Sequence, residues 1–190
     1  MSPKTVDAGE PDGAGMFDGA GEPAVEIVEL EAVRFAAVRS VVAAEDVPDF
    51  MSDALSLVAT ALREAGVAPA GPPFARYFAA GPDGLDLAAG FPVTEPFLGA
   101  GVVHPGELPA GPAAVTTCVG PYGGLEAAWT ALRRRVAELG RTLGDDPWEV
   151  YFIGPGSGVD EAAWRTELIW PLRGAAARPA RQGSGAEPGR

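Results

Sequence analysis

The stretch Asp145–Gly154, DDPWEVYFIG, places one carboxylate among aromatic and aliphatic side chains. Its apolar part, Trp148–Ile153, predicts a short strand that is buried on both faces apart from Glu149. An ionised carboxylate in apolar surroundings is costly unless it is paired or partly hydrated. Glu149 could therefore bind a cationic ligand, or it could act as a general base that activates a water molecule.

Other residues with reactive side chains are few. His104 is the single histidine, and no nucleophile-elbow motif accompanies it as a serine–histidine–aspartate arrangement would require. Cys118 is the single cysteine, which excludes an internal disulfide and a cysteine-rich metal site. We therefore expect no metal and no organic cofactor. His104 is interpreted as an ordinary polar residue and Cys118 as a small buried one.

The composition limits the partners of this chain. Its 190 residues include 26 acidic and 14 basic ones, which gives a formal net charge of −12. Such a field repels nucleic acids and anionic membranes and favours cations. No run of about 18 apolar residues predicts a membrane span, and the N-terminus lacks the apolar core of a secretory signal. We expect a cytoplasmic protein that binds neither nucleic acid nor membranes, with its oligomeric state left open.

Two segments of low complexity flank one predicted domain. Residues 1–23 and 174–190 are rich in Gly, Pro and small or charged residues. They contain too few apolar residues to offset the entropy cost of ordering. The sequence therefore predicts disordered tails at 1–23 and 174–190 and a folded domain over 24–173.

Two amphipathic helices and several short strands are predicted within this domain. Apolar residues recur at helical spacing over Asp49–Ala65 and Gly124–Leu139, and a glycine stops each helix. Trp129 lies on the apolar stripe of the second helix and is interpreted as a core residue. The surrounding strands predict an α+β domain with an antiparallel sheet. They are Val25–Val42 (two strands), Phe74–Phe78, Leu85–Val93, Val102–Leu108, Ala113–Val119, Trp148–Ile153 and Arg165–Leu172.

The order of elements occurs twice along the chain. Gly66 and Gly140, which stop the helices, are 74 positions apart, and so are Tyr77 and Tyr151 in the strands that follow. This correspondence predicts two pseudo-symmetric β-α-β-β repeats.

The repeats, about 25–95 and 100–173, are expected to form one antiparallel eight-stranded sheet. Two long helices would cover one face of this sheet, and the other face would form a ligand groove. Side chains alternate along a strand, so if Trp148 packs on a helix, Glu149 and Tyr151 face the groove. The first repeat has Ala75 at the equivalent position, beside Tyr77, which leaves one carboxylate between two tyrosines.

The second half of the domain contains the stretches VGPYGGLEAAWTALRRRV, WEVYF and TELIWPL, and the first half contains PPFARYF and DLAAGFPV. Together, over about residues 25–173, they resemble the GyrI-like family, an effector-binding domain that also occurs fused to DNA-binding regions in multidrug-sensing regulators. The resemblance implies the two-repeat fold with a ligand channel. The chain departs from the family pattern in two places. Residues 1–23 cannot form a helix-turn-helix, so direct transcription-factor activity is not expected. Ala88 stands where the family often has an acidic residue.

The resemblance also implies the residues of the site. Glu149 corresponds to the family's pocket glutamate, which contacts cationic or polarised lipophilic ligands. Tyr122 and Tyr151 would help to line the pocket, and Phe91 and Trp170 are carried over from the terminal strands. Simpler interpretations stay open: Glu149 could be an exposed residue at a strand edge, and Tyr122 and Tyr151 could serve packing alone, as is favoured for Phe91 and Trp170.

Three functions remain as hypotheses. The first is a stand-alone binding protein for lipophilic, cationic or polarised aromatic small molecules, in drug sequestration or sensing. The second follows from a resemblance to stand-alone hydrolases of the family that open the cyclopropane of DNA-alkylating natural products for self-protection. There Glu149 would activate a water, and Tyr122 or Tyr151 would hydrogen-bond the ligand. The third is a protein-interaction module, such as a gyrase modulator with an acidic surface.

Overall fold

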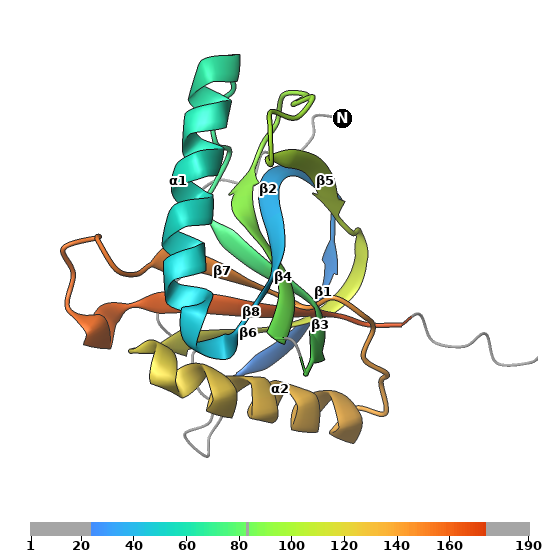
Figure 1. The fold of residues 1–190 in the computed structure, drawn as a ribbon. Helices are drawn as coiled ribbons and strands as arrows, with labels where there is room; N and C mark the ends of the chain where they lie inside the picture. Colours follow the sequence, from blue (N-terminus) through green and yellow to red (C-terminus); the bar gives the residue numbers. More distant parts are fainter. Residues whose placement is uncertain (1–23, 83, 174–190) are drawn as a thin grey trace, which may run out of the picture.

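The computed structural model describes residues 24–82 and 84–173, so the tails predicted at 1–23 and 174–190 lie outside the described residues. In the described ranges, strands and two long helices alternate in the same order in each half of the chain (Figure 1). The first half contains β1 (Val25–Leu30), β2 (Val33–Val42), η1 (Ala44–Asp46), α1 (Val47–Ala65), β3 (Phe74–Gly81) and β4 (Gly84–Pro92). The second half contains β5 (His104–Leu108), β6 (Gly111–Val119), η2 (Tyr122–Gly124), α2 (Leu125–Glu138), β7 (Trp148–Ile153), η3 (Glu161–Ala163) and β8 (Arg165–Pro171).

All of these strands belong to one curled antiparallel sheet with the order β1-β6-β8-β7-β3-β4-β2-β5 (Figure 1). At its centre, β3 of the first repeat pairs with β7 of the second. From this pair, corresponding strands follow in the same order on both sides. The predicted fold class is therefore confirmed: an α+β domain of two β-α-β-β repeats with an eight-stranded antiparallel sheet and two long helices.

The outermost strands are exchanged between the two halves. β1 comes first in the chain but pairs with β6 of the second repeat, and β5 pairs with β2 of the first. The predicted division of Val25–Val42 into two strands is correct, because β1 and β2 pair with different neighbours. Each half of the chain thus supplies the edge strand of the other half.

A pseudo-twofold axis passes between Ala75 and Glu149. These residues are 74 positions apart, as are the two helix-stopping glycines, and they lie directly opposite each other in the β3–β7 pair. Two symmetry-related backbone hydrogen bonds of 2.9 Å flank them: Tyr77 N–H to the Pro147 carbonyl, and Tyr151 N–H to the Pro73 carbonyl. The one buried carboxylate of the domain's central strand pair therefore lies at the axis.

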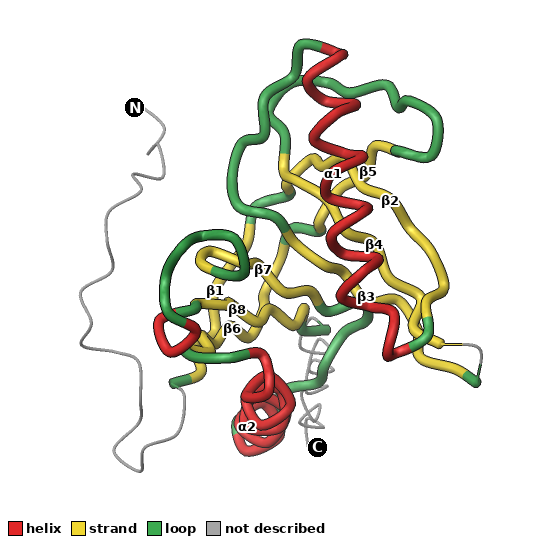
Figure 2. The backbone as a smooth tube through the Cα atoms, turned by 60° about the vertical axis from the view of Figure 1, so that its left-hand side comes forward, coloured by secondary structure: helices red, strands yellow, loops and turns green. Residues whose placement is uncertain are grey.

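Both long helices pack on one face of the sheet, with their axes steeply inclined to each other (Figure 2). Residues opposite one another in antiparallel strands share a face. One row of such partners runs from Val38, under α1, through Ala89, Ala75 and Glu149 to Leu168, under α2. Glu149 therefore lies on the helix-covered face.

The faces predicted for the strand of Glu149 are reversed in the structure. Trp148 does not pack on a helix; it belongs with Phe35 and Phe74 to an apolar cluster on the opposite face. Glu149 and Tyr151 consequently point toward the helices, and the expectation that they face a groove on the helix-free side is wrong. The physical reason is the curl of the sheet, which gives the helix-free face an apolar core of its own.

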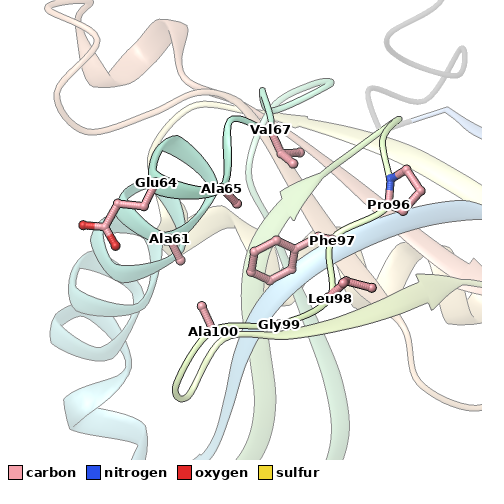
Figure 3. A pocket seen from close by; sticks show the side chains of 9 residues that line it. All are labelled: Ala61, Glu64, Ala65, Val67, Pro96, Phe97, Leu98, Gly99 and Ala100. Atoms are coloured by element: carbon pink, nitrogen blue, oxygen red, sulfur yellow. The ribbon is translucent and has the colours of Figure 1, made fainter.

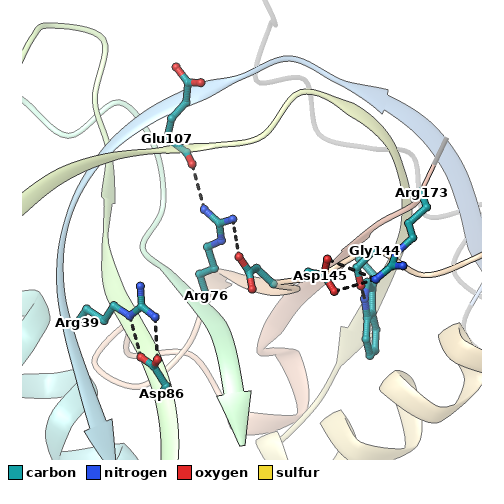
Figure 4. A network of polar contacts seen from close by, with 9 residues as sticks. Arg39, Arg76, Asp86, Glu107, Gly144, Asp145 and Arg173 are labelled. Atoms are coloured by element: carbon teal, nitrogen blue, oxygen red, sulfur yellow. Dashed lines mark hydrogen bonds and ion pairs between the residues drawn. The ribbon is translucent and has the colours of Figure 1, made fainter.

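Arginine–aspartate contacts join strands on that helix-free side (Figure 4). Arg39 of β2 makes a bidentate contact with Asp86 of β4, at 2.8 and 2.7 Å. Arg76 of β3 donates to Asp146 at 3.1 Å and to the backbone carbonyl of Glu107 at 3.0 Å. Arg76 thus connects the first repeat to the segment that leads into β7 and to β5.

The first helix ends at Ala65, as predicted, and the second ends at Glu138, one residue before the predicted Leu139. Gly66 and Gly140 adopt φ angles of 72° and 63°, in the left-handed region that favours glycine after a helix. The first helix begins at Val47 rather than Asp49, because Pro48 fits the first helical turn, where its missing N–H is not needed. No helix among residues 24–82 and 84–173 is long and apolar enough to cross a membrane.

Candidate functional site

The Glu149 carboxylate accepts three side-chain hydrogen bonds. Oε2 accepts from the hydroxyls of Tyr77 at 2.9 Å and Tyr151 at 2.6 Å, and Oε1 accepts from the indole N–H of Trp129 at 2.8 Å. Glu149 is only 3% exposed. In the described part of the chain, no basic side chain forms an ion pair with it. We call these four residues the Glu149 cluster.

Three elements position the Glu149 cluster. Tyr77 of β3 and Tyr151 of β7 are equivalent residues of the two repeats, and both hydroxyls reach the same oxygen. Trp129 comes from α2, where its ring packs edge-on against Trp170 with the ring centroids 5.4 Å apart. The two tyrosines also pack in one apolar cluster with Phe50 of α1. The carboxylate therefore lies on the sheet between the two helices.

The hydrogen bonds of the Glu149 cluster determine which of its polar atoms remain available to a ligand. An ionised carboxylate has about four acceptor positions, of which Tyr77, Tyr151 and Trp129 occupy three. One position on Oε1 remains. Because both tyrosine hydroxyls donate their protons to Oε2, their oxygens keep the capacity to accept. The cluster thus presents acceptors, aromatic rings and a negative charge, which suit a cation or a hydrogen-bond donor.

Burial and the negative charge of Glu149 keep the neighbouring tyrosine hydroxyls and the Cys118 thiol protonated. Burial raises the pKa of the Tyr77 and Tyr151 hydroxyls well above the usual range, and the negative charge of Glu149 adds to the effect. Burial, followed by the same charge, also raises the pKa of Tyr122 and of the Cys118 thiol. The tyrosines therefore act as neutral hydrogen-bond donors at physiological pH.

Aromatic rings continue from the Glu149 cluster toward the loop that precedes β8. The Tyr122 ring lies 5.7 Å from that of Tyr151 and 5.0 Å from that of Trp164, centroid to centroid. Gly154 leaves room for Tyr122, because a Cβ at this position would come within 2.6 Å of the hydroxyl oxygen. The structure therefore brings Tyr122 beside the cluster and adds Trp164 to the row.

The remaining predicted site residues lie farther from the carboxylate. Trp170 packs behind Trp129 and donates its N–H to a backbone carbonyl at 3.0 Å. Phe91 packs in the apolar cluster beneath α1, and no contact described for it reaches Glu149. Ala88, the departure from the family pattern, is buried in the apolar cluster on the opposite face of the sheet.

A surface cavity of about 410 Å³ lies at the C-terminal end of α1 (Figure 3). Phe50, which packs with the site tyrosines, is near the other end of this helix. With a rise of 1.5 Å per residue, the cavity is roughly 15–20 Å farther along α1, so it is separate from the Glu149 cluster. It is lined by Ala61, Glu64, Ala65, Val67, Pro96, Phe97, Leu98, Gly99 and Ala100.

Residues 23–173 match the family profile described as the GyrI-like small molecule binding domain. The match spans most of the chain, so the chain belongs to this family, and the resemblance inferred from the sequence is confirmed. No protein of curated function matches the chain.

Solved structures share the fold. The C-terminal domain of EcmrR superimposes with a TM-score of 0.70 at 20% identity, covering 78% of this chain and 96% of that one. In the EcmrR–DNA complex the TM-score is 0.66 at 20% identity, again over 78% of this chain. The match covers only 56% of the EcmrR chain in that complex. This chain therefore corresponds to a little more than half of the EcmrR chain in that structure.

Two further structures have the same fold at lower identity. A hydrolase encoded by lin2189 from Listeria innocua gives a TM-score of 0.59 at 11% identity, covering 78% of this chain and 91% of that one. SAV2435 bound to tetraphenylphosphonium gives 0.57 at 9% identity, covering 79% and 94%. At these identities the likeness establishes the fold alone.

Two tryptophans of this region are not among the site residues predicted from the sequence. The helical spacing of Trp129 predicts a core residue, but in the structure its N–H donates to Glu149. A useful signal was present, since a buried indole N–H needs an acceptor and a buried carboxylate needs donors. Trp164 follows a Gly-rich loop just before a strand, and its proximity to Tyr122 had no counterpart in the sequence pattern.

Proposed function

We propose that this chain binds lipophilic cations, or polarised aromatic small molecules, at the Glu149 cluster. The observation that carries the proposal is a buried carboxylate held by three neutral donors, with no ion pair to a basic side chain in the described residues. Its negative charge is stabilised locally but not neutralised. A cationic ligand would supply the missing positive charge.

The surroundings of Glu149 favour an aromatic or otherwise apolar cation. Ring faces of Tyr151, Tyr122 and the nearby tryptophans attract positive charge and bury apolar surface. A ligand that uses the remaining acceptor position on Oε1 lies next to the Trp129 indole, whose N–H donates to the same oxygen. Ligand entry should therefore change the surroundings of the indole, and tryptophan fluorescence should report it.

The comparisons support the same class of ligand. The family is described as a small molecule binding domain, and SAV2435, of the same fold, was observed with tetraphenylphosphonium. Sequestration or sensing of lipophilic drugs is the biological role that we propose on this basis.

A fluorescence titration with a charged ligand and its neutral analogue tests the proposal. We expect 10-methylacridinium to bind at micromolar concentration, and Glu149→Gln to weaken it by about tenfold, or 1.4 kcal/mol. Neutral acridine, titrated at alkaline pH, should lose much less affinity in the same variant. Equal losses for both compounds would remove Glu149 from this role.

Hydrolysis is the second candidate function, and the open acceptor position on Oε1 favours it. A water bound there would lie against a carboxylate able to take its proton. The lin2189 protein, which has this fold, is described as a hydrolase. Incubation with a DNA-alkylating compound that carries a strained cyclopropane, followed by mass spectrometry, separates the two functions: addition of one water supports hydrolysis, and recovery of unchanged compound supports binding alone.

A further inference from the structure

The donors around the Glu149 cluster fall into two groups. The hydroxyls of Tyr77 and Tyr151 and the N–H of Trp129 all donate to the carboxylate. The N–H of Trp164 is buried and has no acceptor in the described part of the chain. The hydroxyl of the neighbouring Tyr122 makes no hydrogen bond among the described residues, but Tyr122 is half-buried and its hydroxyl is not among the buried unpaired atoms. Two adjacent donors beside the site are therefore unused.

Local backbone structure holds both unused donors in place. The Trp164 carbonyl accepts from Gly120 N–H at 2.9 Å, and its own N–H donates to the Glu161 carbonyl at 3.1 Å. The Tyr122 ring rests against Gly154 and lies 5.0 Å from the Trp164 ring at an interplanar angle of 46°. A buried donor without an acceptor is unfavourable, so the fixed Trp164 N–H points to an acceptor that arrives with a ligand, and Tyr122 on the neighbouring ring supplies a second donor.

We propose that Tyr122 and Trp164 form a donor subsite that binds a carbonyl oxygen of the ligand. The inference rests on the proposed function and narrows its ligand class. The ligand would be an aromatic molecule that is cationic or polarised at one end and carries a carbonyl at the other. The Tyr122 ring lies between those of Trp164 and Tyr151, with centroid distances of 5.0 and 5.7 Å, so the carbonyl end of the ligand would lie one aromatic ring beyond Tyr151.

In the hydrolysis candidate, the donor subsite would stabilise the negative charge that develops on the carbonyl oxygen. If a strained ring is conjugated to the carbonyl, the water oxygen forms the new C–O bond and its proton passes to Glu149. The electron pair of the broken C–C bond moves to the carbonyl oxygen, where Tyr122 and Trp164 donate to it. That oxygen gains one proton as Glu149 releases one, so one water is added in total.

The test uses neutral fragments that differ in the acceptor only: acetophenone and α-methylstyrene. The chain contains four tryptophans, whose indole ¹⁵N–¹H signals can be assigned from single Trp→Phe variants of the full chain. We expect acetophenone to shift the Trp164 N–H signal downfield and to bind about five- to tenfold more tightly than α-methylstyrene. Trp164→Phe and Tyr122→Phe, which keep the rings, should each reduce this preference toward onefold.

Trp148→Phe is the matched control, because Trp148 lies on the opposite face of the sheet and the preference should persist. Equal binding of the two fragments by the wild type would overturn the proposal and assign the unused donors to water. Persistence of the preference in both ring-retaining variants would also overturn it. Neither fragment is charged, so failure of the 10-methylacridinium titration would count against the proposed function and not against the donor subsite.

Discussion

The two repeats share a backbone but place different side chains around the axis. Tyr77 and Tyr151 are equivalent, and both donate to one carboxylate. Opposite Glu149 in the second repeat, the first repeat has Ala75. At the helix position 74 residues before Trp129, the first repeat has Leu55. The first repeat therefore contributes one tyrosine and apolar surface, whereas the second contributes the charge and its third donor.

This asymmetry follows from the position of the axis. Residues directly opposite in antiparallel strands have Cα atoms about 4.5–5.5 Å apart. A symmetric protein would thus bring two buried carboxylates into contact, and both could not be ionised. Ala75, which is fully buried, carries no charge, so it leaves space for Glu149 and avoids repulsion between two carboxylates. A twofold scaffold can thus hold a single buried charge at its axis only by breaking its own symmetry.

A second glutamate at the axis, which would restore the symmetry, should cause the largest loss of stability. We expect Ala75→Glu to lower the free energy of unfolding by about 3–5 kcal/mol, because it adds an unpaired buried carboxylate next to Glu149. Urea unfolding at neutral pH measures the change.

Moving the carboxylate across the axis is the control. The double variant Ala75→Glu/Glu149→Ala contains one carboxylate between the same two tyrosines, and it should recover much of the loss. If the single and double variants are equally unstable, crowding and not like charge is the cause.

Replacing Trp129 of α2 by the residue type found at the equivalent position of α1 should cause an intermediate loss of stability. Trp129→Leu introduces the residue type of Leu55 and removes a hydrogen bond to a charged group, which contributes about 1.5–3 kcal/mol. We expect urea unfolding to show a loss of this size. Trp129→Phe keeps a ring but lacks the N–H, so it should reproduce most of the loss. A near-normal stability for Trp129→Phe would mean that packing against Trp170, not the hydrogen bond, makes Trp129 important.

Alkaline pH should produce the smallest loss of stability and test the tyrosines around the carboxylate. The three tyrosines of the chain all lie at the site, and burial and Glu149 raise their pKa values above the usual 10.0. In the unfolded chain they ionise near pH 10, so their contribution is full below that pH and is lost as the pH rises above it.

The loss should reach about 1 kcal/mol at pH 10 and grow beyond it. Urea unfolding from pH 8 upward, together with phenolate absorbance of the folded protein, measures both sides of this linkage. Glu149→Gln should lower the pH at which the folded-state tyrosines ionise. Ordinary tyrosine ionisation in the folded wild type would contradict the burial of these hydroxyls.

Local patterns in the sequence were sufficient for the elements and the repeat. Helical spacing located both helices, and the terminal glycines adopt the left-handed angles that stop them. The separation of 74 positions between the glycine pair and between the tyrosine pair indicated the symmetry. Glu149 was recognised as unusual because a carboxylate within an apolar strand needs a partner.

Strand faces could not be assigned in the same way. Alternation identifies the buried face only when the other face is exposed, and here Trp148 and Glu149 are both buried on opposite faces. The curl of the sheet, which depends on all of its strands, supplies the second core. The contact between Trp129 and Glu149 likewise depends on how α2 lies on the sheet, which no local pattern encodes.

The exchanged edge strands have a consequence for synthesis on the ribosome. β1 emerges first, but its partner β6 follows only after the whole first repeat, and β2 lacks its outer neighbour until β5 has emerged. During that interval the nascent sheet has unpaired edges that can pair with another chain. The pairing of β1 with β6 covers the β6 edge only after distant segments meet, which makes folding slow for a domain of this size. Completion of the second repeat is therefore the step that protects the first from aggregation.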